Sequence, residues 1–172
     1  DRRQRQMCIR DSVNTGAIDW AHYGTSQISS RILSASPAIY SDILFVPYSS
    51  GELYALRPSS GQEIWLEYVD SLDDIAGKKL QDFDTDVLFY KTAAYAVSNK
   101  ILSAIDLASG SVAWQQEFGI DNNLSISGNT IFTSNSSHIL AIDSISGELI
   151  YKFSKPLNGE DILDISDIAV YG

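Results

Sequence analysis

Cysteine and positive charge are both scarce in this sequence. Cys8 is the only cysteine among the 172 residues. Disulfides within the chain and clusters of thiolate metal ligands are therefore excluded. Lys and Arg number 12 against 22 Asp and Glu, which gives a formal net charge of −10. Because nucleic acids are bound through clustered basic side chains, this balance argues against a nucleic-acid partner.

Long apolar runs are missing as well. No stretch approaches the roughly 18 consecutive apolar residues that a membrane-spanning helix requires. At the same time, 44% of the residues are hydrophobic, which is typical of a folded globular protein. We therefore expect a folded core and no membrane-spanning segment in these residues.

The first twelve residues differ in composition from the rest of the chain. They hold four of the six arginines and the only Cys and Met, and their apolar residues follow no strand or helix period. The string resembles a translated sequencing adapter, so we interpret residues 1–12 as a non-native scar. We expect this segment to pack poorly, and we assign the fold to residues 13–172.

One short pattern occurs four times in the remaining sequence. Ser or Thr is followed by Gly, three residues and then Trp or Tyr, and all three tryptophans of the chain lie in it. The copies are Thr15-Gly16 with Trp20, Ser60-Gly61 with Trp65, Ser109-Gly110 with Trp114, and Ser146-Gly147 with Tyr151. The glycines are 45, 49 and 37 residues apart. Spacings of this size are typical of repeat architectures.

Each repeat contains four short runs rich in Val, Ile, Leu, Tyr and Phe, bounded by Gly, Ser and Asp. Such runs predict strands and turns. The predicted strands are 37–40, 43–48, 52–56 and 63–69, then 87–90, 94–98, 101–105 and 112–118, then 124–127, 130–134, 139–142 and 149–153. Four strands per unit of 40 to 50 residues favour an all-β fold, a partial β-propeller of about three complete four-stranded antiparallel blades. The blades are 33–70, 84–120 and 122–155, with a blade end at 13–25 and the start of another at 160–172.

The recurring residues are interpreted as structural. We expect each motif glycine to adopt a left-handed conformation, and the aspartate four residues before it to accept backbone N–H bonds in the same turn. We expect the aromatic residue to pack on the adjacent blade. A ligand cage built by the three tryptophans is the less favoured interpretation. The motif residues are Gly16, Trp20, Gly61, Trp65, Asp106, Gly110, Trp114, Asp143, Gly147 and Tyr151.

The segment from Ala104 to Trp114 resembles the repeat of the quinoprotein-type β-propellers. Together with residues 33–37, 47–57 and 80–84, it resembles the BamB-like family of outer-membrane protein assembly lipoproteins. The resemblance implies an eight-bladed, non-catalytic scaffold without cofactor or metal, located at the periplasmic face of the bacterial outer membrane. It further implies docking to the periplasmic domain of the central β-barrel assembly subunit. Membrane contact would come only through a lipid anchor that this sequence does not contain.

The same resemblance implies two docking motifs in the connections between repeats. One is Asp-x-Asp after a leucine, matched by Asp82 and Asp84 after Leu80. The other is Leu-x-Leu-Arg, matched by residues 28–31, where Ile28 and Arg31 fit the pattern and Ser30 departs from it. The alternative interpretation is that Asp82 and Asp84 are solvated turn residues and that Arg31 is a surface charge.

Two other functions stay open. A quinone-dependent dehydrogenase would share the blades, but its adjacent cysteines are missing, and the calcium-loop-like run 82–86 has Val87 and Ala93 where glycine and glutamate are required. The chain could also be a generic propeller that binds another protein or a polysaccharide. His22 and His138 lie in strand contexts without a Gly-x-Ser-x-Gly motif, so no catalytic residue is predicted.

Overall fold

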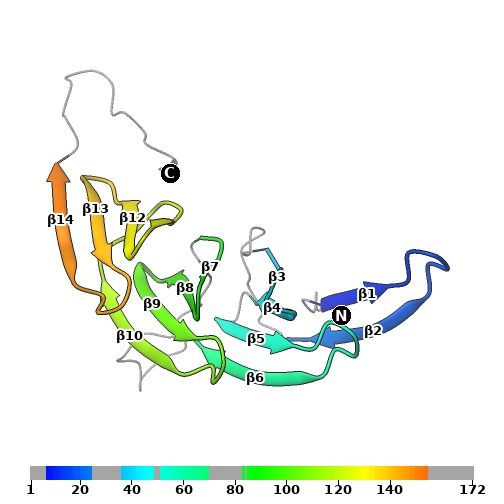
Figure 1. The fold of residues 1–172 in the computed structure, drawn as a ribbon. Helices are drawn as coiled ribbons and strands as arrows, with labels where there is room; N and C mark the ends of the chain where they lie inside the picture. The colour runs from blue at the N-terminus through cyan, green and yellow to red at the C-terminus, as the bar shows by residue number, and fades with distance from the viewer. Residues whose placement is uncertain (1–6, 25–35, 49–50, 70–82, 84, 155–172) are drawn as a thin grey trace, which may run out of the picture. The chain divides into compact units, whose positions relative to one another are not determined.

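A computed structural model describes residues 7–24, 36–48, 51–69, 83 and 85–154 (Figure 1). The described residues form fourteen β-strands, and none of them is helical. Across these ranges, therefore, no helix is long and apolar enough to cross a membrane. The chain divides into two compact units, Asp1–Phe83 and Asp84–Gly172.

The first unit contains a hairpin and one four-stranded sheet. Strands β1 (Met7–Asp11) and β2 (Ile18–Tyr23) pair antiparallel. The sheet follows chain order, with β3 (Ala38–Tyr40), β4 (Ile43–Pro47), β5 (Glu52–Leu56) and β6 (Glu63–Tyr68). Cys8 of β1 and Trp20 of β2 pack against a buried cluster in this sheet that includes Tyr48 and Leu56.

The hairpin corrects two expectations about the start of the chain. Instead of only the blade end expected at 13–25, the first repeat presents two paired strands, with Cys8 opposite His22. The prediction that residues 1–12 pack poorly is wrong for Met7–Asp11, since Arg10 lies 3.5 Å from Asp19 and donates to the Pro58 carbonyl at 2.7 Å. This result concerns packing, and the non-native origin of the segment stays a prediction.

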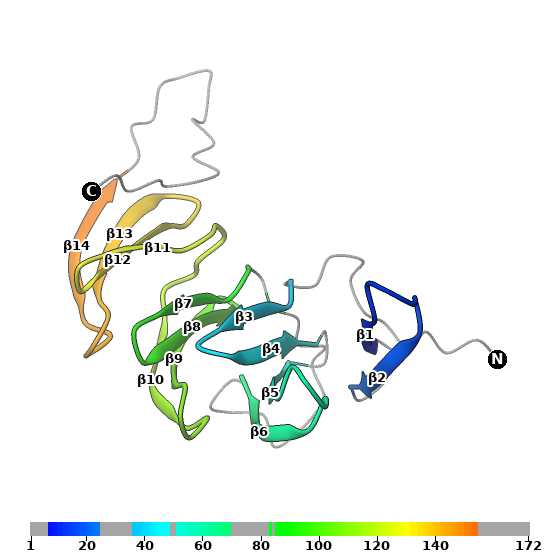
Figure 2. The ribbon, with the colours of Figure 1, turned by 45° about the vertical axis from the view of Figure 1, so that its right-hand side comes forward.

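The second unit contains two four-stranded sheets, each again in chain order (Figures 1 and 2). The first is built from β7 (Leu88–Tyr90), β8 (Ala93–Ser98), β9 (Ile101–Asp106) and β10 (Val112–Glu117). The second is built from β11 (Ser125–Ser127), β12 (Thr130–Ser134), β13 (His138–Asp143) and β14 (Leu149–Ser154). The all-β class and the four-stranded antiparallel repeat are thus confirmed, and every predicted strand begins and ends within one residue of the observed one.

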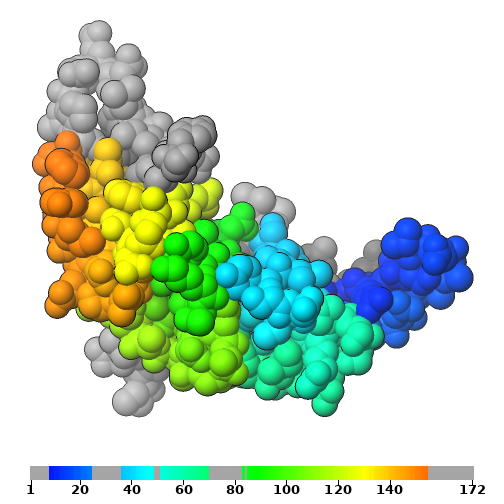
Figure 3. Space-filling model, in the orientation of Figure 1, coloured from blue at the N-terminus to red at the C-terminus, as the bar shows by residue number. Residues whose placement is uncertain are grey.

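The middle strands β5 and β8 are buried on both faces. All five residues of β5 are buried, as are Ala94 to Ser98 of β8. This explains why apolar and polar residues do not alternate there, because a strand covered on both sides needs apolar residues throughout. By contrast, all six residues of β14 are exposed, and this strand lies on the surface in the space-filling view (Figure 3).

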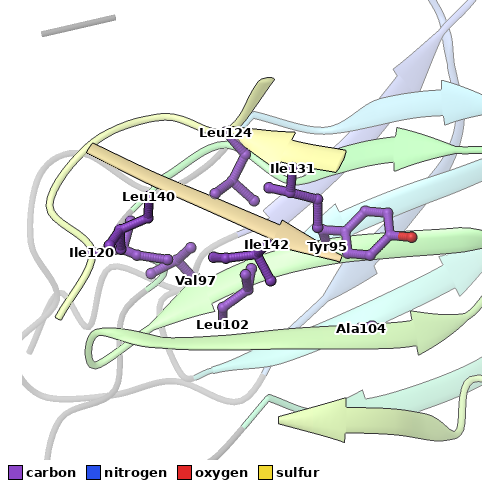
Figure 4. Packing of buried hydrophobic residues seen from close by; sticks show 9 residues of the cluster. All are labelled: Tyr95, Val97, Leu102, Ala104, Ile120, Leu124, Ile131, Leu140 and Ile142. Carbon is purple, nitrogen blue, oxygen red and sulfur yellow. The ribbon is translucent and has the colours of Figure 1, made fainter. Parts of the chain in front are cut away.

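The core of the second unit lies between its two sheets (Figure 4). Side chains from β8 and β9 meet side chains from β12 and β13, and Ile120 and Leu124 reach the same cluster from the connection between the sheets. The buried members are Tyr95, Val97, Leu102, Ala104, Ile120, Leu124, Ile131, Leu140 and Ile142. Burial of a Leu or Ile side chain stabilises a fold by about 1.5–3 kcal/mol, so this cluster contributes substantially to the stability of the unit.

Each repeat also carries an irregularity at one place in its last strand pair. The register shifts between Arg10 and Asp11, Ala55 and Leu56, Val112 and Trp114, and Ala141 and Ile142. A β-bulge inserts an unpaired residue and changes the direction of nearby side chains. In this chain the bulge lies next to the motif turn, where it affects the direction of the motif aromatic side chain.

Candidate functional site

The motif turns share one backbone geometry. Gly16, Gly61, Gly110 and Gly147 have φ angles of 69°, 69°, 77° and 74°. This left-handed region disfavours residues with a β-carbon, so the turn selects glycine. In each turn the glycine N–H donates to the carbonyl four residues earlier, as Gly147 does to Asp143 at 2.9 Å.

Aspartate side chains hold two of these turns. Asp106 Oδ1 accepts N–H bonds from Ala108 and Ser109 at 3.1 and 2.9 Å and the Ser109 hydroxyl at 2.8 Å. Asp143 makes the same set of bonds in the last repeat. Bonds from the Ser109 hydroxyl and backbone lower the pKa of the Asp106 carboxyl. In the first repeat Ser12 replaces the aspartate, and its hydroxyl accepts only the Thr15 N–H, at 3.3 Å.

Two tryptophans lie against the motif glycine of the following repeat. A β-carbon placed on Gly61 would come within 2.7 Å of the Trp20 ring, and one on Gly147 within 2.7 Å of the Trp114 ring. Trp20 Nε1 donates to the Pro58 carbonyl at 3.0 Å, and Trp114 Nε1 to the Ser144 carbonyl at 3.2 Å. Both acceptors stand three residues before the glycine. The ring, the glycine and this carbonyl therefore form one repeated contact.

The other two motif aromatics differ in exposure. Trp65 is 8% exposed, and its ring centroid lies 5.7 Å from that of Phe45. Tyr151 is 59% exposed, and its ring is tilted by 34° against that of Phe153, with the centroids 6.0 Å apart. Tyr151 pairs with Ala141 as Trp114 does with Ala104, so its register is equivalent although its surroundings are not.

A polar cluster that the motif did not predict lies between the hairpin and the first sheet. The Tyr48 hydroxyl lies 2.9 Å from His22 Nδ1 and donates to the His22 carbonyl at 3.2 Å. The His22 ring meets the edge of Tyr54, with centroids 4.5 Å apart. Burial lowers the pKa of His22, against the opposing effects of Glu63 and Glu52, and raises the pKa of Tyr54 to about 12. The cluster therefore favours neutral imidazole and phenol groups.

The predicted docking residues Ile28, Arg31, Asp82 and Asp84 lie outside the described residues. The chain order still places them: the first two belong to the connection from β2 to β3, and the other two to the connection from β6 to β7. Each connection joins the last strand of one repeat to the first strand of the next. Binding residues are often found in long connections of this kind.

Within the described ranges, no three His, Cys, Asp or Glu side chains are grouped to hold a metal ion. The carboxylates of Asp106 and Asp143 are already used by backbone and hydroxyl donors of their own turns. The motif residues thus form a structural turn. Functional residues are therefore expected in the connections between the repeats.

Comparison with known proteins gives the same picture over most of the chain. The sequence model of the family described as "Outer membrane protein assembly factor BamB" matches residues 4–152. The factor of that name from Legionella pneumophila is 28% identical over 124 residues, 69% of this chain and 32% of the relative. The one from Alteromonas naphthalenivorans is 32% identical over 116 residues, 66% of this chain and 28% of the relative. The chain thus spans about a third of the length of these curated relatives.

Solved structures show the same fold at lower identity. The crystal structure of BamB from Moraxella catarrhalis matches with a TM-score of 0.72 and 19% identity, over 85% of this chain and 45% of that one. A europium-containing methanol dehydrogenase matches with a TM-score of 0.68 and 12% identity, over 87% of this chain and 38% of that one. The β-propeller repeat is therefore common to an assembly factor and an enzyme, and the fold alone does not separate their functions.

Proposed function

This chain belongs to the family of the outer membrane protein assembly factor BamB, and on that premise we propose that it is part of a non-catalytic scaffold of the machinery that assembles β-barrels in the bacterial outer membrane. The observation that carries the proposal is the family match over residues 4–152, together with relatives that bear this name. The scaffold works at the periplasmic face of the outer membrane.

The described residues support a scaffold role. Their recurring polar groups are engaged with the chain itself: the Asp106 and Asp143 carboxylates hold turns, and the indole N–H groups of Trp20 and Trp114 hold the neighbouring repeat. Groups used in this way keep the repeats within each unit in fixed positions. A fixed framework lets its connecting segments present binding residues at low entropic cost.

The proposed partner is the periplasmic domain of the central β-barrel assembly subunit. Arg31 and Ile28 in one connection and Asp82 and Asp84 in another are the proposed docking residues. A cation and two anions can orient a partner that carries the complementary charges and can raise the association rate. Asp82 and Asp84 are part of a chain of net charge −10, so they contribute to recognition only if the partner presents basic groups to them.

The test is a calorimetric titration of the full-length parent protein against that periplasmic domain. Asp82→Lys combined with Asp84→Lys should weaken binding by at least about tenfold, the effect of losing a charged contact worth 1.4 kcal/mol. The matched control is Asp42→Lys with Glu148→Lys, which changes net charge equally at two exposed positions. The control should bind like the unaltered protein.

Two results would contradict the proposal. If both double variants bind as tightly as the unaltered protein, the docking residues are wrongly assigned. If the unaltered protein does not bind the domain, the generic binding propeller becomes the better interpretation. Reduction of an artificial electron acceptor with an alcohol substrate and added quinone would instead support the dehydrogenase.

A further inference from the structure

The connection between the two sheets of the second unit is short and anchored at two points. It covers residues 118–124 and leads from β10 to β11. Ile120 is 0% exposed and Leu124 is 9% exposed, and both point into the core cluster (Figure 4). Asp121, Asn122 and Asn123 between them are therefore held at the surface, and two of these three are exposed.

Hydrogen bonds fix this connection to the turn between β8 and β9. The Gly119 N–H donates to the Lys100 carbonyl at 3.2 Å, and the Lys100 ammonium lies 3.3 Å from Asp121 Oδ1. The Lys100 side chain is 61% exposed and that of Asp121 is 38% exposed. The pair thus joins two loops while both charges stay accessible to a partner.

A second turn, between β12 and β13, is fixed to the same connection. The Ser136 N–H donates to Asp121 Oδ2 at 3.1 Å, and Asn135 Nδ2 donates to the Phe118 carbonyl at 2.9 Å. Asn122 Nδ2 donates to Ser134 Oγ at 2.9 Å. Asp121 therefore links three loops, all at the end of the sheets where β8, β10 and β12 finish.

We propose that these three loops form a further docking surface, here called the braced surface and defined by Lys100, Asp121, Asn123, Ser136 and Ser137. The proposal rests on the proposed function, and its partner is the same periplasmic domain. The connection 118–124 is shorter than those that carry Arg31 and Asp82, but it has the same place in the repeat, since it too leads from the last strand of one repeat to the first of the next.

The physical properties of the braced surface fit a folded protein partner. Its loops are held by hydrogen bonds within the chain, so little conformational entropy is lost when a partner binds. Lys100 and Asp121 balance each other, and the remaining members are uncharged. A single cation is too few for phosphate-rich nucleic acid or an anionic lipid surface. Polar loops of a protein domain are the surface that such groups can match by hydrogen bonds.

The test uses the same titration with the full-length parent protein. Ser136→Arg keeps the backbone N–H that braces Asp121 and adds bulk and charge, whereas Lys100→Glu reverses the exposed charge. The matched control is Lys91→Glu: Lys91 also has a positive φ, lies in the turn at the opposite end of β8, and bonds Asn129 Oδ1 at 3.1 Å. Each surface variant should raise Kd at least about fivefold, and the control should leave it unchanged.

The outcomes separate this inference from the proposed function. If Asp82→Lys with Asp84→Lys weakens binding while Ser136→Arg and Lys100→Glu bind like the unaltered protein, the braced surface is wrong and the docking proposal stands. If Lys91→Glu weakens binding as much as Lys100→Glu, the effect is one of overall charge and the inference is overturned. If the unaltered protein fails to bind, both proposals are overturned. Thermal melting of Ser136→Arg confirms that the repeats are folded.

Discussion

The Trp114 ring lies directly on Gly147, so close that a β-carbon there would come 2.7 Å from two of its atoms. The glycine has a φ of 74°, and its N–H closes the turn held by Asp143. Residue 147 must therefore be glycine for two reasons, its backbone conformation and the space that the ring leaves. Substitutions at different glycines can measure the two effects separately.

Gly147→Ala should destabilise the chain by about 2–4 kcal/mol, because it combines a left-handed alanine with overpacking against the ring. The control is Gly128→Ala, where φ is 61° and nothing lies within 4 Å of the added carbon. This control should lose only about 1–2 kcal/mol. Urea denaturation of both variants gives the measurement, and equal losses would show that the Trp114 contact contributes nothing.

Trp114→Ala should destabilise the chain by about 3–5 kcal/mol, since it removes a large side chain and the donor to the Ser144 carbonyl. Tyr151→Ala, at the equivalent motif position but 59% exposed, should lose less than about 1 kcal/mol. Denaturant titration of the two variants shows whether the loss of stability depends on the motif position or on the burial of the side chain. A large loss at Tyr151 would mean that its exposed ring has packing partners in solution.

Acid should weaken the two turns held by aspartate. Because turn donors lower the pKa of Asp106 and Asp143 in the folded chain, their stabilisation is present above the pKa of the unfolded state and is lost as the pH falls through the folded value. Asp106→Asn with Asp143→Asn should flatten that part of the pH dependence of the unfolding midpoint. If the double variant loses stability at low pH as the unaltered chain does, that loss comes from other carboxylates.

His22 should make the first unit less stable below neutral pH. Burial lowers its pKa, so the folded state favours neutral imidazole, and stability falls as the pH drops from above 6.5 through the folded value. An NMR titration should place the His22 ring below the usual histidine pKa. Replacement by Gln should remove the corresponding slope from the unfolding midpoint, and a normal titration in the folded chain would refute the burial argument.

The exposed strand β14 should promote self-association. Leu149, Ile150, Tyr151 and Phe153 are between 42% and 59% exposed and follow one another on an edge strand with a single charge, Lys152. Such strands pair with other chains. Tyr151→Ser with Phe153→Ser should shift the isolated chain towards the monomer in analytical ultracentrifugation. Ile64→Ser with Tyr68→Ser, on the edge strand β6, should have less effect because Glu63 and Glu67 already place two negative charges on that strand.

The sequence predicts the repeat well because glycine and tryptophan are selected by geometry at fixed spacing, and the turn between them admits few alternatives. The sequence does not predict β1, because its arginine-rich surroundings show no strand pattern. In the structure Cys8 packs against the core, while Arg10 forms an ion pair with Asp19 and a hydrogen bond with the Pro58 carbonyl. The His22–Tyr48 contact was also missed, because its partners are 26 residues apart and belong to no motif. The acceptors of the indole N–H groups are backbone carbonyls. Because every residue type has one, the sequence carries no signal for these hydrogen bonds.

The contact between tryptophan and glycine has a direction along the chain. Trp20 reaches forward to Gly61 and Trp114 to Gly147, so in both of these pairs the earlier copy supplies the ring and the later copy supplies the glycine. Every copy encodes both a glycine and an aromatic residue within one short segment, so duplication of one repeat would bring both halves of this contact with it. A change in repeat number would then need no new kind of interface, and the unequal glycine spacings of 45, 49 and 37 residues show that the connections vary in length while the turn is kept.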